Sequence, residues 1–383
     1  MPLTIAYFSG SIIPSRAANS VHVMRMCAAF AETGCEVVLA AIEGDRTLAG
    51  DDFETYGVAP RFRIVKHAMK SGGILARLRY ARAAPILVRR EIEPDLVYGR
   101  HLLSLSVASR WGVPVIFETH QAPSRLERLV ERRLFRRPNF ARLVVISEAL
   151  RDEYRRCHPD LPAHRILVAP DAADPPADDA TTDDAAAVSI RRAGRLQVGY
   201  VGHLYPGKGM EMVAALARHM PDVDFHVVGG TETDLARWRA GGNGNGGNGS
   251  NLVFHGHVPA VRTEGYRRAV DVLLAPYQPV VRSAGGRAEI GRWMSPLKIF
   301  EYMGSGRAMI VSDLPVLREI VTDGETALLA RPDDVDAWVA AVERLRDPTL
   351  RQELAERARA QLVARHTWAR RSTDVLAGLK GAA

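Results

Sequence analysis

Short apolar runs alternate with amphipathic segments along most of the chain, and this alternation is interrupted once near the middle. In the first half, the apolar runs that we expect to form strands lie at residues 3–8, 36–42, 62–65, 95–98, 113–117, 143–146 and 166–168. In the second half they lie at residues 196–201, 224–228, 252–254, 272–274 and 309–311. Strands that alternate with helices form mostly parallel sheets covered by helices on both faces. The pattern therefore predicts an α/β chain with two doubly wound, Rossmann-like domains.

The interruption is a segment rich in Ala, Asp and Pro at residues 171–187, which has no apolar periodicity and is typical of a flexible linker. A Gly/Asn-rich tract at residues 240–250 is typical of a mobile surface loop. The length of 383 residues suits two cores rather than one. We predict an N-terminal domain at residues 1–170, a linker at 171–193, a C-terminal domain at 194–365 and a final helix at 366–383.

The net charge of +7 suits anionic substrates or an acidic membrane surface, and it does not require nucleic acid as a partner. The three cysteines, Cys27, Cys35 and Cys157, are too sparse for a disulfide framework and indicate reduced thiols in the cytoplasm. We find neither a leader sequence nor an apolar run of the length that spans a membrane. We therefore expect a cytoplasmic protein, with peripheral contact at the inner face of the plasma membrane left open.

Two basic amphipathic helices, expected at residues 74–90 and 125–137, bear on that open question. Their apolar residues could simply face the core and leave the arginines in water. Alternatively, the helices could contact anionic lipid, which would suit a lipid-linked substrate. Sequence alone does not decide between these two interpretations.

Residues 295–306 form a distinct motif, in which Ser295 is expected to cap a helix and Pro296 to take its first position. Free amides at a helix start, with Lys298 in the first turn, make an anion site. Glu301, one turn further on, can accept hydrogen bonds from paired hydroxyls such as those of a ribose. The alternative is a capped surface helix on which Lys298 and Glu301 form an ordinary ion pair.

A second anion candidate is the glycine-bearing loop at residues 202–209, which follows the first strand of the second domain. Glycines let backbone amides approach a phosphate, and Lys208 adds a positive charge. Met210 stands where a nucleotide-binding P-loop needs Ser or Thr, so an ATPase is excluded. The alternative is a simple turn between strand and helix.

The motif at residues 295–306 resembles the C-terminal signature of family 4 glycosyltransferases, which have the GT-B fold of two Rossmann-like domains facing a cleft. In that family the glutamate at Glu301 holds the ribose of a sugar nucleotide, and the helix start, here Ser295, Leu297 and Lys298, holds the diphosphate. The usual glutamate eight positions earlier is Trp293 here, as in a subgroup whose motif reads Ser-Pro-Leu-Lys. The last helix of the fold crosses back onto the first domain.

The resemblance extends to the loop at residues 202–209, where the lysine of the family contacts the donor diphosphate. It implies that Gly202, His203 and Lys208 bind the donor, although His203 replaces the arginine common in the family. Arg282, Arg287 and Arg292, which lie between this loop and the signature helix, could add diphosphate or carboxylate contacts or form a solvated basic loop.

In the first domain, the resemblance points to His120, at the end of the strand at residues 113–117. The family has a histidine there that touches the donor sugar, so we expect His120 to bond a sugar hydroxyl and to support charge at the reacting carbon. Glu118 alone does not supply the carboxylate pair of a glycosidase. The loop at residues 9–22 resembles the acceptor-side loop and offers Arg16, Asn19 and His22, although His22 could equally be a buried helix histidine.

The resemblance implies a retaining glycosyltransferase that moves a sugar from a nucleotide-diphosphate sugar to a hydroxyl of a glycan or lipid-linked acceptor. Its setting would be cell-surface polysaccharide or glycolipid synthesis, with His120, Lys208 and Glu301 as catalytic residues. We find no Asp-x-Asp metal motif of the kind that GT-A enzymes use and no His/Cys cluster, so we expect neither a metal nor a cofactor besides the donor. The alternatives are a degenerate protein that only binds a nucleotide sugar or a partner, and a GT-B nucleotide-sugar epimerase.

Overall fold

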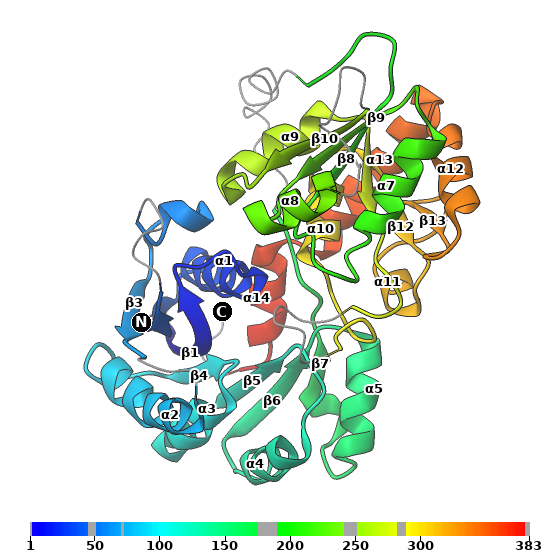
Figure 1. The fold of residues 1–383 in the computed structure, drawn as a ribbon. Coiled ribbons are helices and arrows are strands. Elements are labelled where there is room, and N and C mark those ends of the chain that lie inside the picture. The colour runs from blue at the N-terminus through cyan, green and yellow to red at the C-terminus, as the bar shows by residue number, and fades with distance from the viewer. Residues whose placement is uncertain are drawn as a thin grey trace. The chain divides into compact units, whose positions relative to one another are not determined.

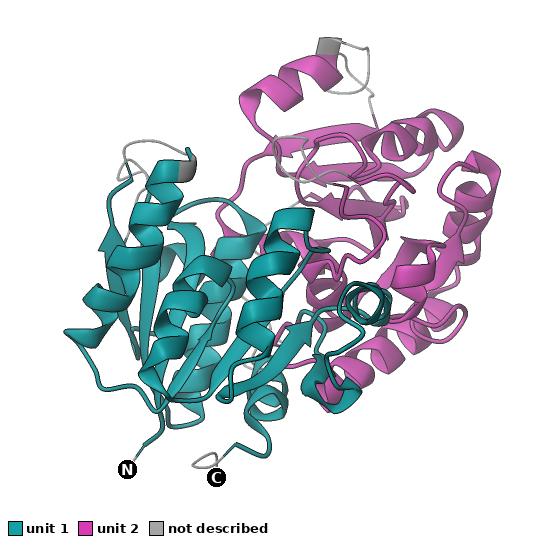
Figure 2. Ribbon diagram, turned by 90° about the horizontal axis from the view of Figure 1, so that it is seen from below, with its two compact units in different colours: residues 1–171, 368–383 teal, residues 172–367 magenta. Residues whose placement is uncertain are grey.

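The computed structural model describes residues 2–44, 51–69, 73–174, 190–240, 251–281 and 289–379. The chain divides into two compact units, one formed by residues 1–171 with 368–383 and the other by residues 172–367 (Figure 2). Most of the expected linker and of the Gly/Asn-rich tract lies outside the described residues. We call the two parts unit 1 and unit 2 and describe each by itself.

Unit 1 is built on a parallel seven-stranded sheet with the order β3-β2-β1-β4-β5-β6-β7 (Figure 1). Its strands are β1 (Thr4–Ile13), β2 (Glu36–Glu43), β3 (Arg63–His67), β4 (Leu96–Gly99), β5 (Val115–Thr119), β6 (Phe140–Val145) and β7 (Ile166–Val168). The chain order reverses between β1 and β4. Ligands of open α/β sheets bind at the carboxyl ends of the strands around such a reversal.

The helices of unit 1 are α1 (Ala18–Glu32), α2 (Ile74–Arg89), α3 (Leu102–Ala108), α4 (Arg125–Phe135), α5 (Glu148–Cys157) and α14 (Trp368–Leu376). Local sequence explains several of their starts. Ser124 and Glu127 form a capping box at α4, and the Ser147 hydroxyl accepts a hydrogen bond from the Leu150 amide at α5. Helix α14, from the end of the chain, packs along α1.

Unit 2 is built on a parallel six-stranded sheet with the order β10-β9-β8-β11-β12-β13. Its strands are β8 (Gln197–Val201), β9 (Asp224–Val228), β10 (Leu252–Gly256), β11 (Val272–Ala275), β12 (Ala308–Ser312) and β13 (Leu328–Ala330). Its helices are α7 (Met210–His219), α8 (Glu232–Ala240), α9 (Thr263–Ala269), α10 (Leu297–Gly304), α11 (Pro315–Arg318), α12 (Val335–Arg344) and α13 (Pro348–Arg365). The reversal of strand order here lies between β8 and β11.

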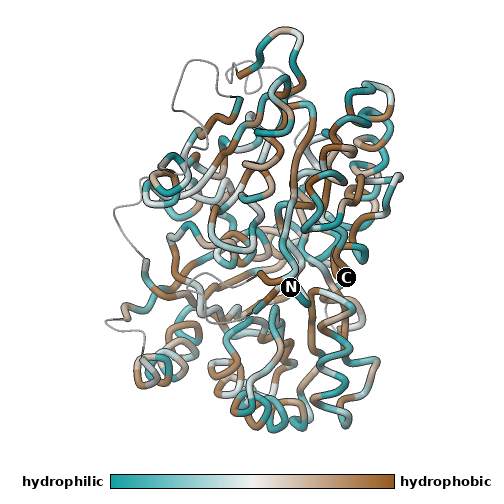
Figure 3. Tube along the Cα trace, turned by 45° about the vertical axis from the view of Figure 1, so that its right-hand side comes forward, coloured by the Kyte–Doolittle hydropathy of each residue, from teal (hydrophilic) through white to brown (hydrophobic). Residues whose placement is uncertain are grey.

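Strands β4, β5, β9, β11 and β12 are buried along their whole length, as is usual for central strands of parallel sheets that helices cover on both faces. Hydrophobic stretches recur along the chain of both units (Figure 3). The largest fully buried side chain is Trp338 of α12, which packs in the core of unit 2. The indole nitrogen of Trp338 donates a hydrogen bond to the Arg331 carbonyl. Among the described residues, no helix is both long and apolar enough to cross a bilayer.

One expected helix start is wrong. The signature helix α10 begins at Leu297, its cap position is Pro296, and no side chain caps it. Pro296 has an extended conformation with ψ of 119°, so the helix starts one residue later than the Ser-Pro pattern predicts. The expected end is confirmed, because α10 stops at Gly304 and Gly306 has a positive φ of 66°.

Candidate active site

The signature helix α10 is fixed over the carboxyl ends of the two central strands of unit 2. The Tyr302 hydroxyl accepts a hydrogen bond from the Val201 amide of β8 at 2.9 Å and contacts the Leu274 carbonyl of β11 at 3.3 Å. These strands flank the reversal of strand order. The N-terminus of α10 therefore belongs to the region where this fold binds ligands.

Glycines at both ends of the 202–209 loop allow close approach to Lys298 of α10 at one end and to Pro276, after β11, at the other. Gly202 has a φ of +150°, and a Cβ there would lie 2.8 Å from both Cε and Nζ of Lys298. Gly209 has a φ of +85°, and a Cβ there would lie 1.7 Å from the Pro276 carbonyl oxygen. A side chain at Gly202 would displace the Lys298 ammonium group, and the positive φ itself favours glycine at this position.

Lys298 is a buried lysine whose ammonium group faces a tyrosine ring. It is 9% exposed, and its Nζ lies 3.6 Å from the centre of the Tyr200 ring. Nζ has no hydrogen-bond partner in the described part of the chain. Burial, together with the nearby charge of Lys208, holds the pKa of Lys298 well below its usual range. The surface pair of Lys298 with Glu301 is not formed.

Lys208 lies against two aromatic rings of the same region. Its Nζ lies 4.8 Å from the centre of the Tyr277 ring and 5.1 Å from that of Tyr205. Burial lowers the pKa of Lys208 to about 8. Two desolvated ammonium groups repel each other, so an anion bound between them would stabilise both.

Glu301 pairs with an arginine that the sequence analysis missed. The Arg267 guanidinium of α9 donates to the Glu301 carboxylate at 3.4 Å and to Glu264 at 2.9 Å. The Glu301 side chain is 37% exposed, whereas that of Arg267 is 9% exposed. Burial would lower the pKa of Arg267, but Glu301 and Glu264 outweigh it and raise that pKa. Arg267 therefore orients an accessible carboxylate that keeps free acceptor positions.

The other expected donor residues lie nearby in sequence but differ in exposure. His203 is exposed just after β8, and its carbonyl accepts a 2.5 Å hydrogen bond from the Tyr200 hydroxyl. Ser295 is buried, and Leu297 opens α10. Arg292 is exposed with its guanidinium 5.3 Å from the Trp293 ring centre, whereas Arg282 and Arg287 lie outside the described residues.

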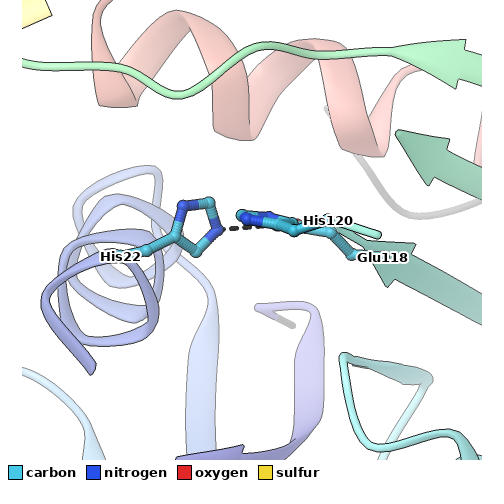
Figure 4. A group of neighbouring side chains, drawn as sticks. All are labelled: His22, Glu118 and His120. Atoms are coloured by element: carbon cyan, nitrogen blue, oxygen red, sulfur yellow. Dashed lines mark hydrogen bonds and ion pairs between the residues drawn. The ribbon is translucent and has the colours of Figure 1, made fainter. Parts of the chain in front are cut away.

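Unit 1 holds a second group of polar side chains, around the carboxyl end of β5 (Figure 4). The His120 Nε2 lies 2.6 Å from Oε1 of the fully buried Glu118. The His22 Nε2 from α1 lies 2.7 Å from the same oxygen, and the His22 Nδ1 lies 2.8 Å from Asp171. His22 is 1% exposed, so the structure places it as a buried helix histidine, the second of its two interpretations.

Arg371 of α14 and Tyr98 of β4 complete this group. The Arg371 guanidinium contacts both carboxylate oxygens of Glu118 at 3.2 Å, and the Tyr98 hydroxyl donates to Oε2. Arg371 also donates to the Ala169 and Pro170 carbonyls at 3.2 and 2.9 Å. Burial would raise the pKa of Glu118, but Arg371 and His22 outweigh it and hold that pKa well below its usual range.

His120 stays neutral in this setting. Burial, and then the positive charge of Arg100, lower the pKa of His120 to about 3. Arg100 follows β4 and was not considered from the sequence. Its Nη1 is buried and has no hydrogen-bond partner in the described ranges. Arg100 therefore adds a positive charge near His120.

The ligating atoms of His22, Glu118 and His120 lie within 4.8 Å of one another, so this donor set could hold a divalent metal. No such cluster is evident in the sequence, because the three residues come from two distant segments without a metal-binding spacing. An ion there would have to compete with Arg371 for the Glu118 oxygens. The geometry thus favours a network of hydrogen bonds with an internal cation over a metal centre.

Two candidates of unit 1 remain. Arg16 lies between β1 and α1, and Asn19 lies in the first turn of α1. Both are exposed. Among the described residues, neither of them forms a hydrogen bond or ion pair with the Glu118 group. Their expected role toward an acceptor stays a prediction.

Arg371 carried a sequence signal that was overlooked. In α14 it lies at helical spacing with Trp368, Ser372, Val375 and Leu376, all of which are buried. A charged residue on the apolar face of an amphipathic helix indicates a buried ion pair. The partner itself, 253 positions away, is not predictable from such a pattern.

Comparison with known proteins agrees with this architecture. A model described as Glycosyltransferase Family 4 matches residues 20–176, and a model described as Glycosyl transferases group 1 matches residues 195–347. Together they account for most of both units. The chain belongs to the family 4 glycosyltransferases.

Among curated proteins, a phosphatidyl-myo-inositol mannosyltransferase of Mycolicibacterium smegmatis is 29% identical over 176 residues. That match spans 45% of this chain and 41% of the relative, less than half of the relative's length.

Two solved structures show the fold. The Anabaena protein HepE in complex with UDP and glucose has a TM-score of 0.70 at 16% identity, covering 97% of this chain and 98% of that one. Sucrose-phosphate synthase from Thermosynechococcus elongatus has a TM-score of 0.70 at 18% identity, covering 97% and 96%. The predicted GT-B fold class is confirmed.

Proposed function

We propose that this protein is a retaining glycosyltransferase that transfers a sugar from a nucleotide-diphosphate sugar to a hydroxyl of a glycan or lipid-linked acceptor. The observation that carries the proposal is the buried Lys298 ammonium group, which has no hydrogen-bond partner in the described chain and lies near the second cation Lys208. A bound diphosphate would supply the negative counter-charge for the ammonium groups of Lys298 and Lys208. The relatives, named for mannosyl transfer or solved with UDP, support the same ligand class.

Each candidate site residue of unit 2 has a distinct role in the proposed reaction. Charge develops on the diphosphate as its bond to the sugar breaks. Lys208, Lys298 and the free amides at the start of α10 stabilise that charge without giving up a proton. Glu301, oriented by Arg267, accepts hydrogen bonds from the two ribose hydroxyls.

His120 of unit 1 contributes a neutral imidazole that binds a sugar hydroxyl. The lowered pKa of His120, about 3, disfavours general acid catalysis by its protonated form near neutral pH. We place the reaction in cell-surface polysaccharide or glycolipid synthesis and assign no metal to it. The anionic donor accounts for the basic character of the site.

We also propose peripheral contact of α4 with anionic lipid, as suits a lipid-linked acceptor. Leu126 and Leu129 are 75% and 56% exposed on this helix, and Arg125, Arg132 and Arg133 are exposed beside them. Exposed leucines among arginines match the composition of helices that lie in a membrane interface.

The donor proposal is tested by thermal shift with UDP, GDP, ADP, CMP and their common sugar conjugates in metal-free buffer. A nucleotide at ~100 times its dissociation constant adds about 2.7 kcal/mol of stability. We expect one nucleotide to stand out and its shift to be lost in Glu301→Ala. Glu325→Ala, at an exposed position of the same unit, is the matched control and should keep the shift.

No shift with any nucleotide would contradict the donor site. A normal shift without transfer or hydrolysis of the sugar would favour the alternative of a degenerate binding protein. Release of a free, epimerised sugar would favour a nucleotide-sugar epimerase.

A further inference from the structure

Glu118 is the centre of the polar group in unit 1. It is 0% exposed, yet its two oxygens meet the guanidinium of Arg371, the hydroxyl of Tyr98 and the ring nitrogens of two histidines. A buried carboxylate is costly unless it is paired and fully hydrogen-bonded. The donors around Glu118 compensate for its burial and favour its ionised form.

The pairing fixes the direction of the hydrogen bond to His120. With Arg371 on both of its oxygens, Glu118 is ionised and can only accept hydrogen bonds. The proton in the 2.6 Å contact therefore belongs to the Nε2 of His120. Because His120 is neutral, its other nitrogen, Nδ1, carries a lone pair.

That Nδ1 has no hydrogen-bond partner within the described residues. The His120 side chain is 18% exposed, while those of Glu118, His22 and Arg371 are 0 to 2% exposed. His120 is thus the member of the group that a ligand can reach. It offers that ligand an acceptor and no donor.

We propose that Glu118 is a positioning residue for His120: held ionised by Arg371, it takes the Nε2 proton and leaves Nδ1 to accept a hydrogen bond from a hydroxyl of the bound sugar. This inference rests on the proposed transferase function. A lone pair on Nδ1 of His120 makes the sugar site specific for a hydroxyl group that donates a hydrogen bond to this nitrogen. A group that can only accept finds an unfavourable contact of two lone pairs there.

The tautomer is measurable without any activity. The protein, labelled with ¹⁵N in its 12 histidine rings, gives two-bond proton–nitrogen correlations that distinguish the tautomers. The His120 signals are assigned as those missing in His120→Asn. We expect His120 to be a neutral Nε2–H tautomer in the wild type and a mixture of tautomers in Glu118→Gln.

Kinetics of the same variant separate positioning from folding. In Glu118→Gln we expect kcat/KM for the donor to fall by roughly 10- to 100-fold, as for other residues that orient a histidine. The matched control is Glu131→Gln, since Glu131 is 1% exposed in the same unit and bonds His158 at 2.8 Å and Tyr154 at 2.8 Å. It should lower stability but keep kcat/KM and the His120 tautomer.

The outcomes are distinct. A wild-type His120 that carries its proton on Nδ1, or that shifts on addition of Zn²⁺ and recovers with chelator, overturns the inference and leaves the donor site standing. An unchanged kcat/KM in Glu118→Gln also overturns it. Failure of the wild type to bind any nucleotide sugar instead contradicts the proposed function, whatever the tautomer.

Discussion

Lys298 illustrates how a single residue can join fold and chemistry. Its position in the first turn of α10 was evident from the Ser-Pro-Leu-Lys motif, but its burial against Tyr200 was not. The i, i+3 spacing to Glu301 suggests a surface pair, whereas Glu301 pairs with Arg267 from another helix. Burial without a partner is costly for an ammonium group, so an anion that binds beside Lys298 would remove part of that cost.

The residue scale yields a pH prediction. Lys208 has a pKa of about 8 in the empty protein, and a bound diphosphate raises it because it favours the charged form. Binding is therefore strong below this pKa and weakens as the pH rises through it. Calorimetry between about pH 7 and 9 should show falling affinity and proton uptake on binding.

The matched variant for this prediction is Lys208→Met, which keeps an aliphatic chain against Tyr205 and Tyr277. It should bind nucleotide more weakly and lose the part of the pH dependence that comes from Lys208. An affinity that stays constant across the range in the wild type would show that Lys208 does not face the diphosphate.

At the scale of the element, the sequence predicted most strands and the longer helices, because alternation of apolar and polar residues is a local signal. It missed β13, α8, α9 and α11, which are short or weakly amphipathic. The exposure of Leu126 and Leu129 on α4 also could not be predicted. Periodicity defines an apolar face but not which part of that face the sheet covers.

Helix α4 gives the prediction for this scale. Wild-type protein should float with liposomes that contain anionic lipid and should do so less at high salt. Leu126→Ser with Leu129→Ser should remove the binding, because the apolar anchor is lost. Val363→Ser, at a 53% exposed position of α13, is the control. Absence of flotation at low salt would refute the membrane contact.

At the scale of the whole molecule, the last helix, α14, contributes a residue to the polar group of unit 1. Arg371 lies in the last helix and pairs with Glu118, which lies 253 positions earlier in the same unit. Individual candidates such as His120 and Lys208 were evident from loops at strand ends. The pairing of Glu118 with Arg371 and that of Glu301 with Arg267 became evident only from the folded chain, because contacts between distant segments have no local signature.

The buried pair predicts a specific stability defect. Arg371→Leu leaves an uncompensated carboxylate and should destabilise unit 1 by about 3–5 kcal/mol in urea unfolding. The low pKa of Glu118 stabilises the folded state above the unfolded pKa, and this contribution is lost as the pH falls. In Arg371→Leu the contribution should be lost at a higher pH. Adding Glu118→Gln should restore part of the stability, and strictly additive losses would show that the two residues are not coupled.

The central claim, retaining sugar transfer, is tested most directly by the anomer that the protein first releases. The donor found by thermal shift is incubated with wild-type protein, and the sugar formed by slow hydrolysis is followed by proton NMR before it mutarotates. We predict that the first product keeps the anomeric configuration of the donor and that Glu301→Ala forms it far more slowly. A product of inverted configuration would contradict the retaining mechanism, and a donor left intact would contradict the transferase.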